Sequence, residues 1–413
     1  MLAGILAYYF ASPWLTTWFW IMVLIAVVWL RRHIDLYRGR REPCLTERDA
    51  DGLPPEPPSL TVLVAAKDEE ANIGRCLAGL LAQDYPHLQI VAINDRSDDR
   101  TGDIIDELAA RDARLTAVHV TELQPGWFGK NNAMRTGMAH ATSDLLCFTD
   151  ADCTFDSHRL MSAAVNYAQH ERIEFLSVLP LLEAHTFWEQ VVQPVAGAIM
   201  VFWFPPQKVN NPKSARAYAN GAFMLMSRQA YDQLGGHEAV RATLNEDMHL
   251  ARQAKAAGVP IRVLRGGELY RVRMYTGLKD IWRGWSRIFY GCFGTFPRLL
   301  VSVIMLAIFS VSPYLSLVAA AFTGTAAPWI AATSLLAILA QQSILWPYYR
   351  LSGVLPVWAL SYPLGALFCL GMTLNAMLRV GGSSTTWRGT TYQGGALSSP
   401  QSDQDNPKTT NRS

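Results

Sequence analysis

Four long stretches of the sequence contain no Asp, Glu, Lys or Arg, and they limit the possible folds more than any other feature. They are Gly4–Leu30, Leu299–Phe322, Ala326–Tyr349 and Val354–Leu378, and each is at least 24 residues long. About 20 apolar residues in a helix cross a bilayer, whereas a helix buried in a soluble core rarely stays uncharged for so long. The chain is therefore predicted to be a multi-pass membrane protein with one large charged region.

The first stretch is predicted to be a membrane anchor rather than a cleaved signal peptide. It has no basic segment before it, and it is longer than the apolar core of a signal peptide. Five arginines follow it closely: Arg31, Arg32, Arg38, Arg40 and Arg41. Because basic residues beside a span stay on the cytoplasmic side, we expect the charged region to lie in the cytoplasm at the inner membrane of the cell.

Short apolar runs alternate with helical patterns between the first and second stretches. We expect strands at Leu60–Ala66, Gln89–Ile93, Leu115–Val120 and Leu145–Thr149, and helices at Glu69–Ala82 and Asp103–Arg111. This alternation predicts an α/β domain with Rossmann-like βαβ units and a mostly parallel sheet. The net charge of only +2 argues against a nucleic-acid partner held mainly by phosphate contacts.

The sequence therefore divides into five predicted regions. A transmembrane anchor covers residues 1–32, and a proline-rich linker covers 33–58. The α/β domain covers 59–298, and a membrane region with two to three spans covers 299–380. A polar tail follows at 381–413, and its Ser, Gln, Asn and Asp content predicts disorder after residue 396.

Carboxylates follow three of the predicted strands at the point where each strand ends. Asp68 and Glu69 follow the first strand, and Asp95 follows the second. Asp150 and Asp152 follow the fourth. Any one of these acids could cap the next helix. Gathered at the ligand-binding edge of a parallel sheet, they would repel one another without a cation or a hydrogen-bonding ligand.

Asp150 and Asp152 are two residues apart, so their side chains share one face of an extended strand end. Such oxygens suit Mg²⁺ or Mn²⁺, which take one or two protein carboxylates and bind phosphate oxygens as well. The sequence has no glycine-rich phosphate loop of the GxGxxG or GxxxxGKS/T type. A diphosphate would therefore be held by a metal ion and basic side chains.

Five motifs, in this order, resemble the family 2 glycosyltransferases with a GT-A fold. They are Ala66–Ile73, Asn94–Ser97, Gly126–Lys130, Asp150–Asp152 and Asn245–Asp247, and the resemblance covers roughly residues 60–290. Three further segments are similar to the membrane-bound branch that acts on lipids, such as the hopanoid-associated, carotenoid and ceramide glycosyltransferases. They are Arg273–Tyr275, Gly284–Trp285 and Trp387–Tyr392. The resemblance implies a GT-A catalytic domain with N-terminal and C-terminal transmembrane helices.

The resemblance also implies a donor site for a UDP-sugar. Glu69 and Asp95 would contact the uracil and ribose, because a carboxylate accepts hydrogen bonds from the uracil N3–H and the ribose hydroxyls. Lys130 would neutralise the donor, and Asp150 would lie nearer the sugar or ribose. The alternatives are helix capping for Glu69 and a solvated loop position for Lys130.

By the same resemblance, Asp152 would be the ligand of Mg²⁺ or Mn²⁺, and Asp247 would be the general base. In an inverting transfer, a carboxylate removes the proton of the acceptor hydroxyl while the metal ion stabilises the diphosphate leaving group. Asn245–Asp247 precedes a helical run, so an N-terminal helix acid is the alternative role for Asp247.

An aromatic stripe lies just before the second uncharged stretch. Trp282, Trp285, Phe289, Phe293 and Phe296 recur at helical spacing, with Lys279, Arg283 and Arg287 on an adjacent face. Core packing would explain such a stripe, but basic residues beside it and a span after it favour a helix at the membrane surface. We expect Trp282, Trp285 and Arg283 to lie near the acceptor or the membrane.

Single-sugar transfer to a membrane lipid is the leading functional hypothesis. The QxxRW motif of processive polysaccharide synthases is absent, and the corresponding region reads Trp282–Arg287. A polysaccharide or polyprenyl-phosphate glycosyltransferase is the alternative enzyme. A nucleotide-sugar-binding membrane protein without turnover is the alternative from another class, although Asp95, Asp150, Asp152 and Asp247 are all present.

The number of spans affects the position of the C-terminal tail. Four full spans would place Trp387–Gly389 outside the cell. The resemblance of this motif to the membrane-bound branch, and the basic residues of the tail, instead favour the cytoplasmic side. The stretches Ala326–Tyr349 and Val354–Leu378 contain prolines and polar or glycine residues. We therefore expect one of these two to be re-entrant or interfacial and the tail to be cytoplasmic.

Overall fold

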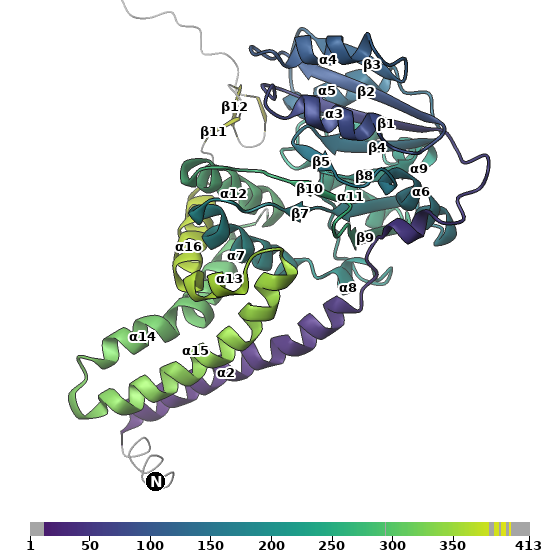
Figure 1. The fold of residues 1–413 in the computed structure, drawn as a ribbon. Helices are drawn as coiled ribbons and strands as arrows, with labels where there is room; N and C mark the ends of the chain where they lie inside the picture. The colour runs from purple at the N-terminus through teal and green to yellow at the C-terminus, as the bar shows by residue number, and fades with distance from the viewer. Residues whose placement is uncertain (1–11, 294, 380–383, 388–389, 394–395, 398–413) are drawn as a thin grey trace, which may run out of the picture.

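The protein is described by a computed structural model, in which a sheet domain is joined to a base of long helices (Figure 1). The structure describes residues 12–293, 295–379, 384–387, 390–393 and 396–397. Parts of three sequence-based expectations lie outside these residues: the start of the first stretch, Arg388 and Gly389 of the late motif, and disorder from residue 398 onward.

The sheet domain is built on seven strands in the order β3-β2-β1-β4-β8-β6-β9. The strands are β1 (Leu60–Ala66), β2 (Leu88–Asp95), β3 (Leu115–Val120), β4 (Leu145–Asp150), β6 (Phe175–Leu179), β8 (Met224–Ser227) and β9 (Ile261–Arg265). Only β8 runs antiparallel to its neighbours β4 and β6 in this sheet. The predicted α/β class with a mostly parallel sheet is confirmed.

Apolar side chains pack on both faces of the sheet, and helices cover them. One face carries α3 (Ile73–Leu81), α4 (Thr101–Ala109) and α6 (Leu160–His170). The other carries α5 (Gly129–Met138), α9 (Arg228–Gln233), α10 (Gly236–Ala239) and α11 (Glu246–Ala256). A short 3₁₀ helix, η1 (Glu47–Ala50), packs on α6. A second sheet pairs β10 (Tyr270–Val272) with β5 (Cys153–Phe155) and β7 (Leu181–Leu182).

The register of the central strands brings the acidic loops together. Ala65 of β1 pairs with Ile93 of β2 and with Asp150 of β4. The carboxyl ends of these three parallel strands therefore meet at one edge of the sheet, as the sequence predicts. Helix α3 begins at Ile73 rather than at Glu69, because residues 67–72 form a turn that hydrogen-bonds to the loop after β2.

The helical base contains four helices long and apolar enough to cross a membrane among the described residues. They are Pro13–Arg40, Phe296–Ala320, Gly324–Leu351 and Pro356–Leu378. The first is α2 (Pro13–Arg40), which continues past the predicted anchor boundary at residue 32. The second comprises α13 (Phe296–Met305), a π-helical turn η2 (Leu306–Val311) and α14 (Ser312–Ala320). The third contains η3 (Gly324–Ala326) and α15 (Ala327–Leu351), and the fourth η4 (Pro356–Ser361) and α16 (Tyr362–Leu378).

The four candidate spans differ in what they pack against. Helices α2 and α15 lie side by side along most of the base (Figure 1). Helix α16 instead packs on α7 (Phe187–Trp203), α12 (Leu278–Phe293) and α13. Gly365 and Gly371 permit this close approach, because a β carbon at either position would collide with Val191 of α7 or Trp282 of α12. The short helix α8 (Pro206–Val209) links α7 back to the sheet domain.

The aromatic stripe of α12 is part of the protein core. Trp285, Phe289 and Phe293 are at most 4% exposed, and they pack in one cluster with residues of α7 and α16. The expectation that this face lies on the membrane surface is therefore wrong. Helical periodicity shows that a face is apolar, but it does not show what covers that face. Phe296 is half exposed, at the start of the next helix.

The residues that the structure describes after position 379 form three short strands. These are β11 (Ser384–Trp387), β12 (Thr390–Gln393) and β13 (Ala396–Leu397), joined as a small antiparallel sheet. The late motif thus begins in β11 and resumes in β12.

Candidate active site

A cavity of about 500 Å³ opens at the carboxyl edge of the sheet and extends toward the helical base. Its polar end is formed by the loops after β1, β2 and β4 and by the start of α5. Its other walls come from α7, α11, α12 and α15. The cavity therefore joins the predicted donor residues to helices that are far away in the sequence.

Asp95 is held at the polar end by a bidentate ion pair. The Arg96 guanidinium donates to both carboxylate oxygens, at 2.8 and 3.1 Å, and Asp95 is only 4% exposed. Arg96 has a left-handed backbone conformation, with φ 55°, and its side chain folds back onto the Asp95 carboxylate. Gly129 makes room for the pair, since a β carbon there would lie 2.8 Å from Asp95 Oδ2.

Glu69 lines the same end of the cavity. Its Oε2 accepts a hydrogen bond from Asn72 Nδ2 at 2.8 Å, and its backbone N–H donates to Thr101 Oγ1. Helix α3 has no acidic residue in its first turn, because Glu69 precedes the N-cap residue Asn72. The alternative role of a first-turn helix acid is therefore wrong for Glu69.

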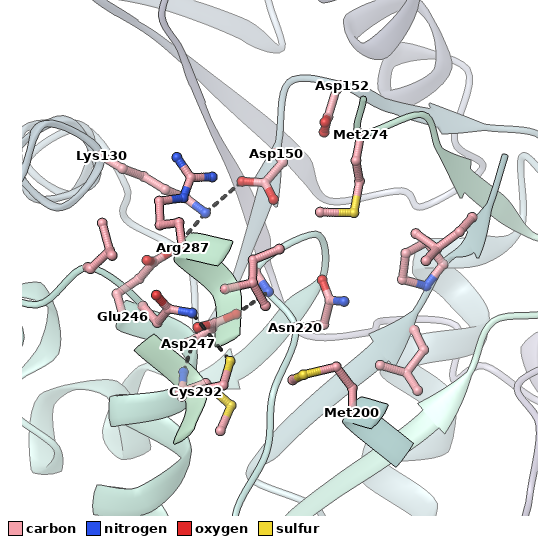
Figure 2. Close-up of a pocket in the computed structure, with 18 of the residues that line it drawn as sticks. Lys130, Asp150, Asp152, Met200, Asn220, Glu246, Asp247, Met274, Arg287 and Cys292 are labelled. Atoms are coloured by element: carbon pink, nitrogen blue, oxygen red, sulfur yellow. Dashed lines mark hydrogen bonds and ion pairs between the residues drawn. The ribbon is translucent and has the colours of Figure 1, made fainter. Parts of the chain in front are cut away.

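Lys130 links the two sides of the cavity. Its Nζ lies 2.6 Å from Asp150 Oδ1 and 2.7 Å from Glu246 Oε1 (Figure 2). Burial alone would lower the pKa of Lys130, but Asp150 and Glu246 raise it above its usual range. The alternative of a solvated loop lysine is therefore wrong. Glu246 is 6% exposed in its side chain, and its pairing with Lys130 is a contact that sequence reasoning missed.

Asp152 lies on the Asp150 side, away from Asp247 (Figure 2). Burial raises the pKa of Asp152 to about 7, and the negative charges of Asp150 and Glu69 add to the effect. Its Oδ1 is buried without a hydrogen-bond partner. An unpartnered carboxylate oxygen beside other carboxylates fits a divalent cation. The cation would provide a partner for the oxygen and would offset the repulsion between the carboxylates.

The described residues contain no group of three or more His, Cys, Asp or Glu side chains arranged to hold a metal ion. Mg²⁺ and Mn²⁺ do not need such a group when a substrate supplies phosphate oxygens. Asp152, with Asp150 beside it, would provide the one or two carboxylates that such a site takes from the protein.

Asp247 begins the other wall of the cavity, at the start of α11. Its two oxygens accept hydrogen bonds from the backbone N–H groups of Met248, at 2.6 Å, and Gly221, at 3.0 Å. Burial raises the pKa of Asp247 to about 7, and the nearby Glu246 carboxylate adds to this rise. Gly221 lies beside the charged groups of Lys130, Glu246 and Asp247, since a β carbon there would be 2.9 Å from Lys130 Nζ. A carboxyl with a pKa near neutrality is well suited to accept a proton.

The three predicted acceptor-side residues occupy different places. Trp285 lines the cavity, whereas Trp282 packs against Gly371 and Phe368 of α16. Arg283 is exposed and does not line the cavity.

Two arginines that had no predicted role also line the cavity. Arg273 pairs at 3.2 Å with Glu189 of α7, a carboxylate with no exposed surface. Arg287 donates to the Tyr275 hydroxyl at 3.4 Å. The motif Arg273–Tyr275 and the basic face of α12 were the available signals, but only the fold shows that both reach the cavity.

Comparisons with known proteins identify the family of the chain. The family described as "Glycosyltransferase like family 2" matches residues 57–281. Two curated relatives are the 4,4'-diaponeurosporenoate glycosyltransferases of Staphylococcus aureus strains MRSA252 and USA300. Each is 26% identical over 263 residues, which are 63% of this chain and 68% of the relative.

Two solved structures are similar in outline. One is the mannosyltransferase PcManGT of Pyrobaculum calidifontis in complex with GDP-Man and Mn²⁺, with a TM-score of 0.48, 18% identity, and coverage of 86% of this chain and 99% of that one. The other is Staphylococcus aureus TarS 1-349 in complex with UDP-GlcNAc, with a TM-score of 0.41, 12% identity, and coverage of 81% and 96%. The expected family 2 match is confirmed by the family model, and the expected α/β fold with a mostly parallel sheet is confirmed by the strand order.

Proposed function

Because this chain belongs to glycosyltransferase family 2, we propose that it moves one sugar from a UDP-sugar to a membrane lipid, with inversion at the sugar carbon. The transfer takes place at the cytoplasmic leaflet. One observation carries the proposal: a single cavity holds the donor-type carboxylates at one end, Asp247 in its wall and apolar helices at the other end.

The donor binds at the strand ends. Glu69 and Asp95 accept hydrogen bonds from the uracil N3–H and the ribose hydroxyls. Lys130 neutralises the donor, and Asp150 lies near the sugar or ribose. Asp152, with the unpartnered Oδ1, would hold Mg²⁺ or Mn²⁺, and the bound cation would neutralise the charge that develops on the diphosphate.

Asp247 accepts the proton of the acceptor hydroxyl. The acceptor oxygen forms a bond to the anomeric carbon as the bond from that carbon to the diphosphate breaks, and UDP leaves. Two backbone N–H groups hold the Asp247 carboxylate in the cavity wall without neutralising it, which supports this role.

Two further observations support a lipid acceptor. The Staphylococcus aureus relatives are named for a transfer to diaponeurosporenoate, which suggests an apolar acceptor here as well. The chain also has candidate membrane helices, and α15 contributes Tyr348 to the cavity wall. The acceptor can therefore reach the site without leaving the bilayer.

The arrangement of the base also supports a cytoplasmic tail. Helix α15 returns along α2 toward the sheet domain, and α16 stays at that end beside α12 and α7 (Figure 1). We infer that α2, α13–α14 and α15 cross the membrane, that α16 is re-entrant or interfacial, and that the tail lies on the side of the sheet domain. The arginines at the end of α2 favour the cytoplasm for that side, by the positive-inside rule.

The proposed function is tested by release of UDP from UDP-glucose, UDP-galactose and UDP-N-acetylglucosamine. The full-length protein is assayed in native membranes, with Mn²⁺ or with EDTA. We expect at least one donor to give UDP release that requires both the cation and the membrane lipids. If no donor is turned over while Mn²⁺-dependent UDP binding is normal, the protein binds nucleotide sugars without acting as the enzyme proposed here.

A further inference from the structure

Arg273 lies beside Asp152 at the end of a strand pair. Strand β10 runs antiparallel to β5, and its last residue, Val272, stands opposite Cys153. One residue farther along this register, Arg273 stands opposite Asp152, and opposite residues of antiparallel strands share a face. Both line the cavity, whereas Val272 and Cys153 are buried in the core. Figure 2 shows Met274, the next residue of the chain, in the same part of the cavity as Asp152. The Arg273 guanidinium is therefore within reach of the proposed metal ligand.

These two groups do not pair with each other. Among the residues that the structure describes, Arg273 has an ion pair with Glu189 but none with Asp152. Oδ1 of Asp152 is buried without a hydrogen-bond partner, and so is Nε of Arg273. Leaving both atoms unpaired is unfavourable, because each has lost the hydrogen bonds that water would give it. A direct contact between the guanidinium and the ionised carboxylate would remove this cost, so another contact must keep Arg273 in its place.

Glu189, in the first turn of α7, provides that contact. Its Oε1 accepts a hydrogen bond from Arg273 Nη2 at 3.2 Å, and its side chain has no exposed surface. Its Oε2 accepts from the backbone N–H groups of His185 and Thr186, as part of a capping box. Both carboxylate oxygens are thus engaged, and the start of the helix fixes their position. Glu189 does not itself line the cavity, whereas Arg273 does.

The position of Arg273 suits a phosphate group. A guanidinium is a planar donor that matches phosphate oxygens, and the unpartnered Nε leaves a donor of Arg273 available. If Arg273 paired with Asp152 instead, the guanidinium would occupy the carboxylate oxygens that a divalent cation needs. Such a pair would also use up the donors that a phosphate needs. The contact with Glu189 therefore keeps two binding groups available at once.

We propose that Glu189 is a positioning residue that holds Arg273 away from Asp152. Asp152 then stays open to the divalent cation, and Arg273 stays available to the phosphates of the donor. This assignment rests on the proposed function, from which it takes the cation and the diphosphate, and it adds a residue outside the cavity. Removal of the Glu189 charge should release Arg273 to pair with Asp152, so cation binding should weaken even without a nucleotide.

The first measurement is the binding of Mn²⁺ alone, by electron paramagnetic resonance, to the full-length protein in phosphatidylcholine nanodiscs. Asp152→Ala defines the background. We expect Glu189→Gln to bind Mn²⁺ roughly tenfold to a hundredfold more weakly than the wild type, the range that a hydrogen bond between charged groups gives. Arg273→Gln should bind Mn²⁺ at least as tightly as the wild type. The double variant should bind as Arg273→Gln does, because no guanidinium is left to occupy Asp152.

The second measurement separates the phosphates from the nucleoside. UDP binding is measured by calorimetry with Mn²⁺, and uridine is measured as a competitor of UDP. Arg273→Gln, Glu189→Gln and the double variant should each weaken UDP binding roughly tenfold or more, through the lost contact to phosphate. Uridine affinity should stay at the wild-type value, which also shows that each variant is folded.

A neighbouring ion pair provides the matched control. Arg271, two residues earlier on β10, pairs with Glu183 at 2.6 Å, and neither residue lines the cavity. Arg271→Gln and Glu183→Gln remove the same charges from the same part of the fold. Both variants should leave Mn²⁺ and UDP binding unchanged.

Glu189→Asp provides the test if Glu189→Gln does not fold. An aspartate can form the hydrogen bonds of a capping box, as Asp49 does in η1, but it is one methylene shorter and holds Arg273 less firmly. It should weaken Mn²⁺ binding less than Glu189→Gln does. Addition of Arg273→Gln should restore the Mn²⁺ affinity.

Wild-type Mn²⁺ affinity in the Glu189 variants would overturn the assignment. So would a double variant that binds as weakly as the Glu189 variant alone, because the loss would then come from the fold. A wild type that binds no more Mn²⁺ than Asp152→Ala would also overturn it. UDP release from the UDP-sugars is measured separately on the wild type. Release without the predicted binding changes would contradict only the role of Glu189, whereas the binding changes without release would contradict only the proposed function.

Discussion

The proposed donor end and the proposed acceptor end of the cavity, called the donor end and the acceptor end below, are constructed in different ways. The donor end consists of the last residues of β2 and β4 and the short loops after β1, β2 and β4, and the register of these neighbouring parallel strands brings their carboxylates together. The acceptor end consists of α7, α12 and α15, which are distant in sequence and meet only when the helical base is packed. Changes at the donor end should therefore affect nucleotide binding and chemistry together, whereas changes at the acceptor end should affect transfer alone.

Loss of the metal ligand should have the largest effect. Asp152→Ala removes the unpartnered carboxylate, and we expect transfer to fall by about three orders of magnitude or more, since a metal ion contributes several kcal/mol at a diphosphate leaving group. Mn²⁺-dependent UDP binding, measured by calorimetry, should be lost as well. Asp156→Asn, a carboxylate outside the cavity that pairs with Arg271, is the control. Full turnover in EDTA would refute the assignment of a metal-dependent donor site.

Loss of the base should separate the two ends. Asp247→Asn keeps the size of the side chain but cannot accept a proton, so we expect the transfer rate to fall by roughly 10²–10⁴. UDP affinity should change little, because Asp247 lies on the wall opposite Asp152. The rate and the affinity are measured on the same membranes, with Asp232→Asn, on the exposed side of α9, as the control. A normal rate for Asp247→Asn would place the base elsewhere.

The pH dependence of transfer should show how Glu246, which pairs with Lys130, affects the pKa of Asp247. The pKa of Asp247 is raised to about 7, first by burial and then by the negative charge of Glu246. A base must be deprotonated, so the wild-type kcat/KM should rise as pH increases through about 7. Glu246→Gln removes the like charge and lowers the pKa of Asp247, which should move this rise to lower pH.

The same pH profile measured with Glu238→Gln, an exposed carboxylate on α10, gives the control. A rise that stays at the same pH in Glu246→Gln would mean that Glu246 does not set the protonation of the base.

The smallest effect on activity should come from cysteines placed to report topology. Phe322, which is 86% exposed between α14 and α15, and Ser398 are replaced by cysteine in separate variants. On intact cells, we expect an impermeant thiol reagent to label Phe322→Cys and to leave Ser398→Cys unlabelled until the membrane is opened. Labelling of Ser398→Cys from outside would show that α16 is a full fourth span.

The donor end could be predicted from sequence because its signals are local. The predicted bounds of Leu60–Ala66 and Leu115–Val120 agree with β1 and β3 at both ends, since each is a short run rich in β-branched residues. The acidic residues that follow such runs must lie at the ligand-binding edge of a parallel sheet. The antiparallel strand Met224–Ser227 is short and has no alternating pattern, and it was not predicted.

The acceptor end could not be predicted because its contacts are long-range. The spacing of Trp285, Phe289 and Phe293 marks an apolar face, but the sequence does not show that α16 covers it. The motif that contains Glu246 was recognised, yet its ion pair with Lys130 depends on how α5 and α11 meet across the sheet edge. Only the packed structure brings Tyr348 of α15 to the same cavity as Asp247.

The most direct test of the account is mass spectrometry of the lipids made when membranes containing the full-length protein are given UDP-sugar and Mn²⁺. The account predicts a membrane lipid that gains a single sugar, and no such product from the Asp247→Asn membranes. A ladder of products with many sugars, or sugar found only on water-soluble material, would contradict the transfer of one sugar to a lipid.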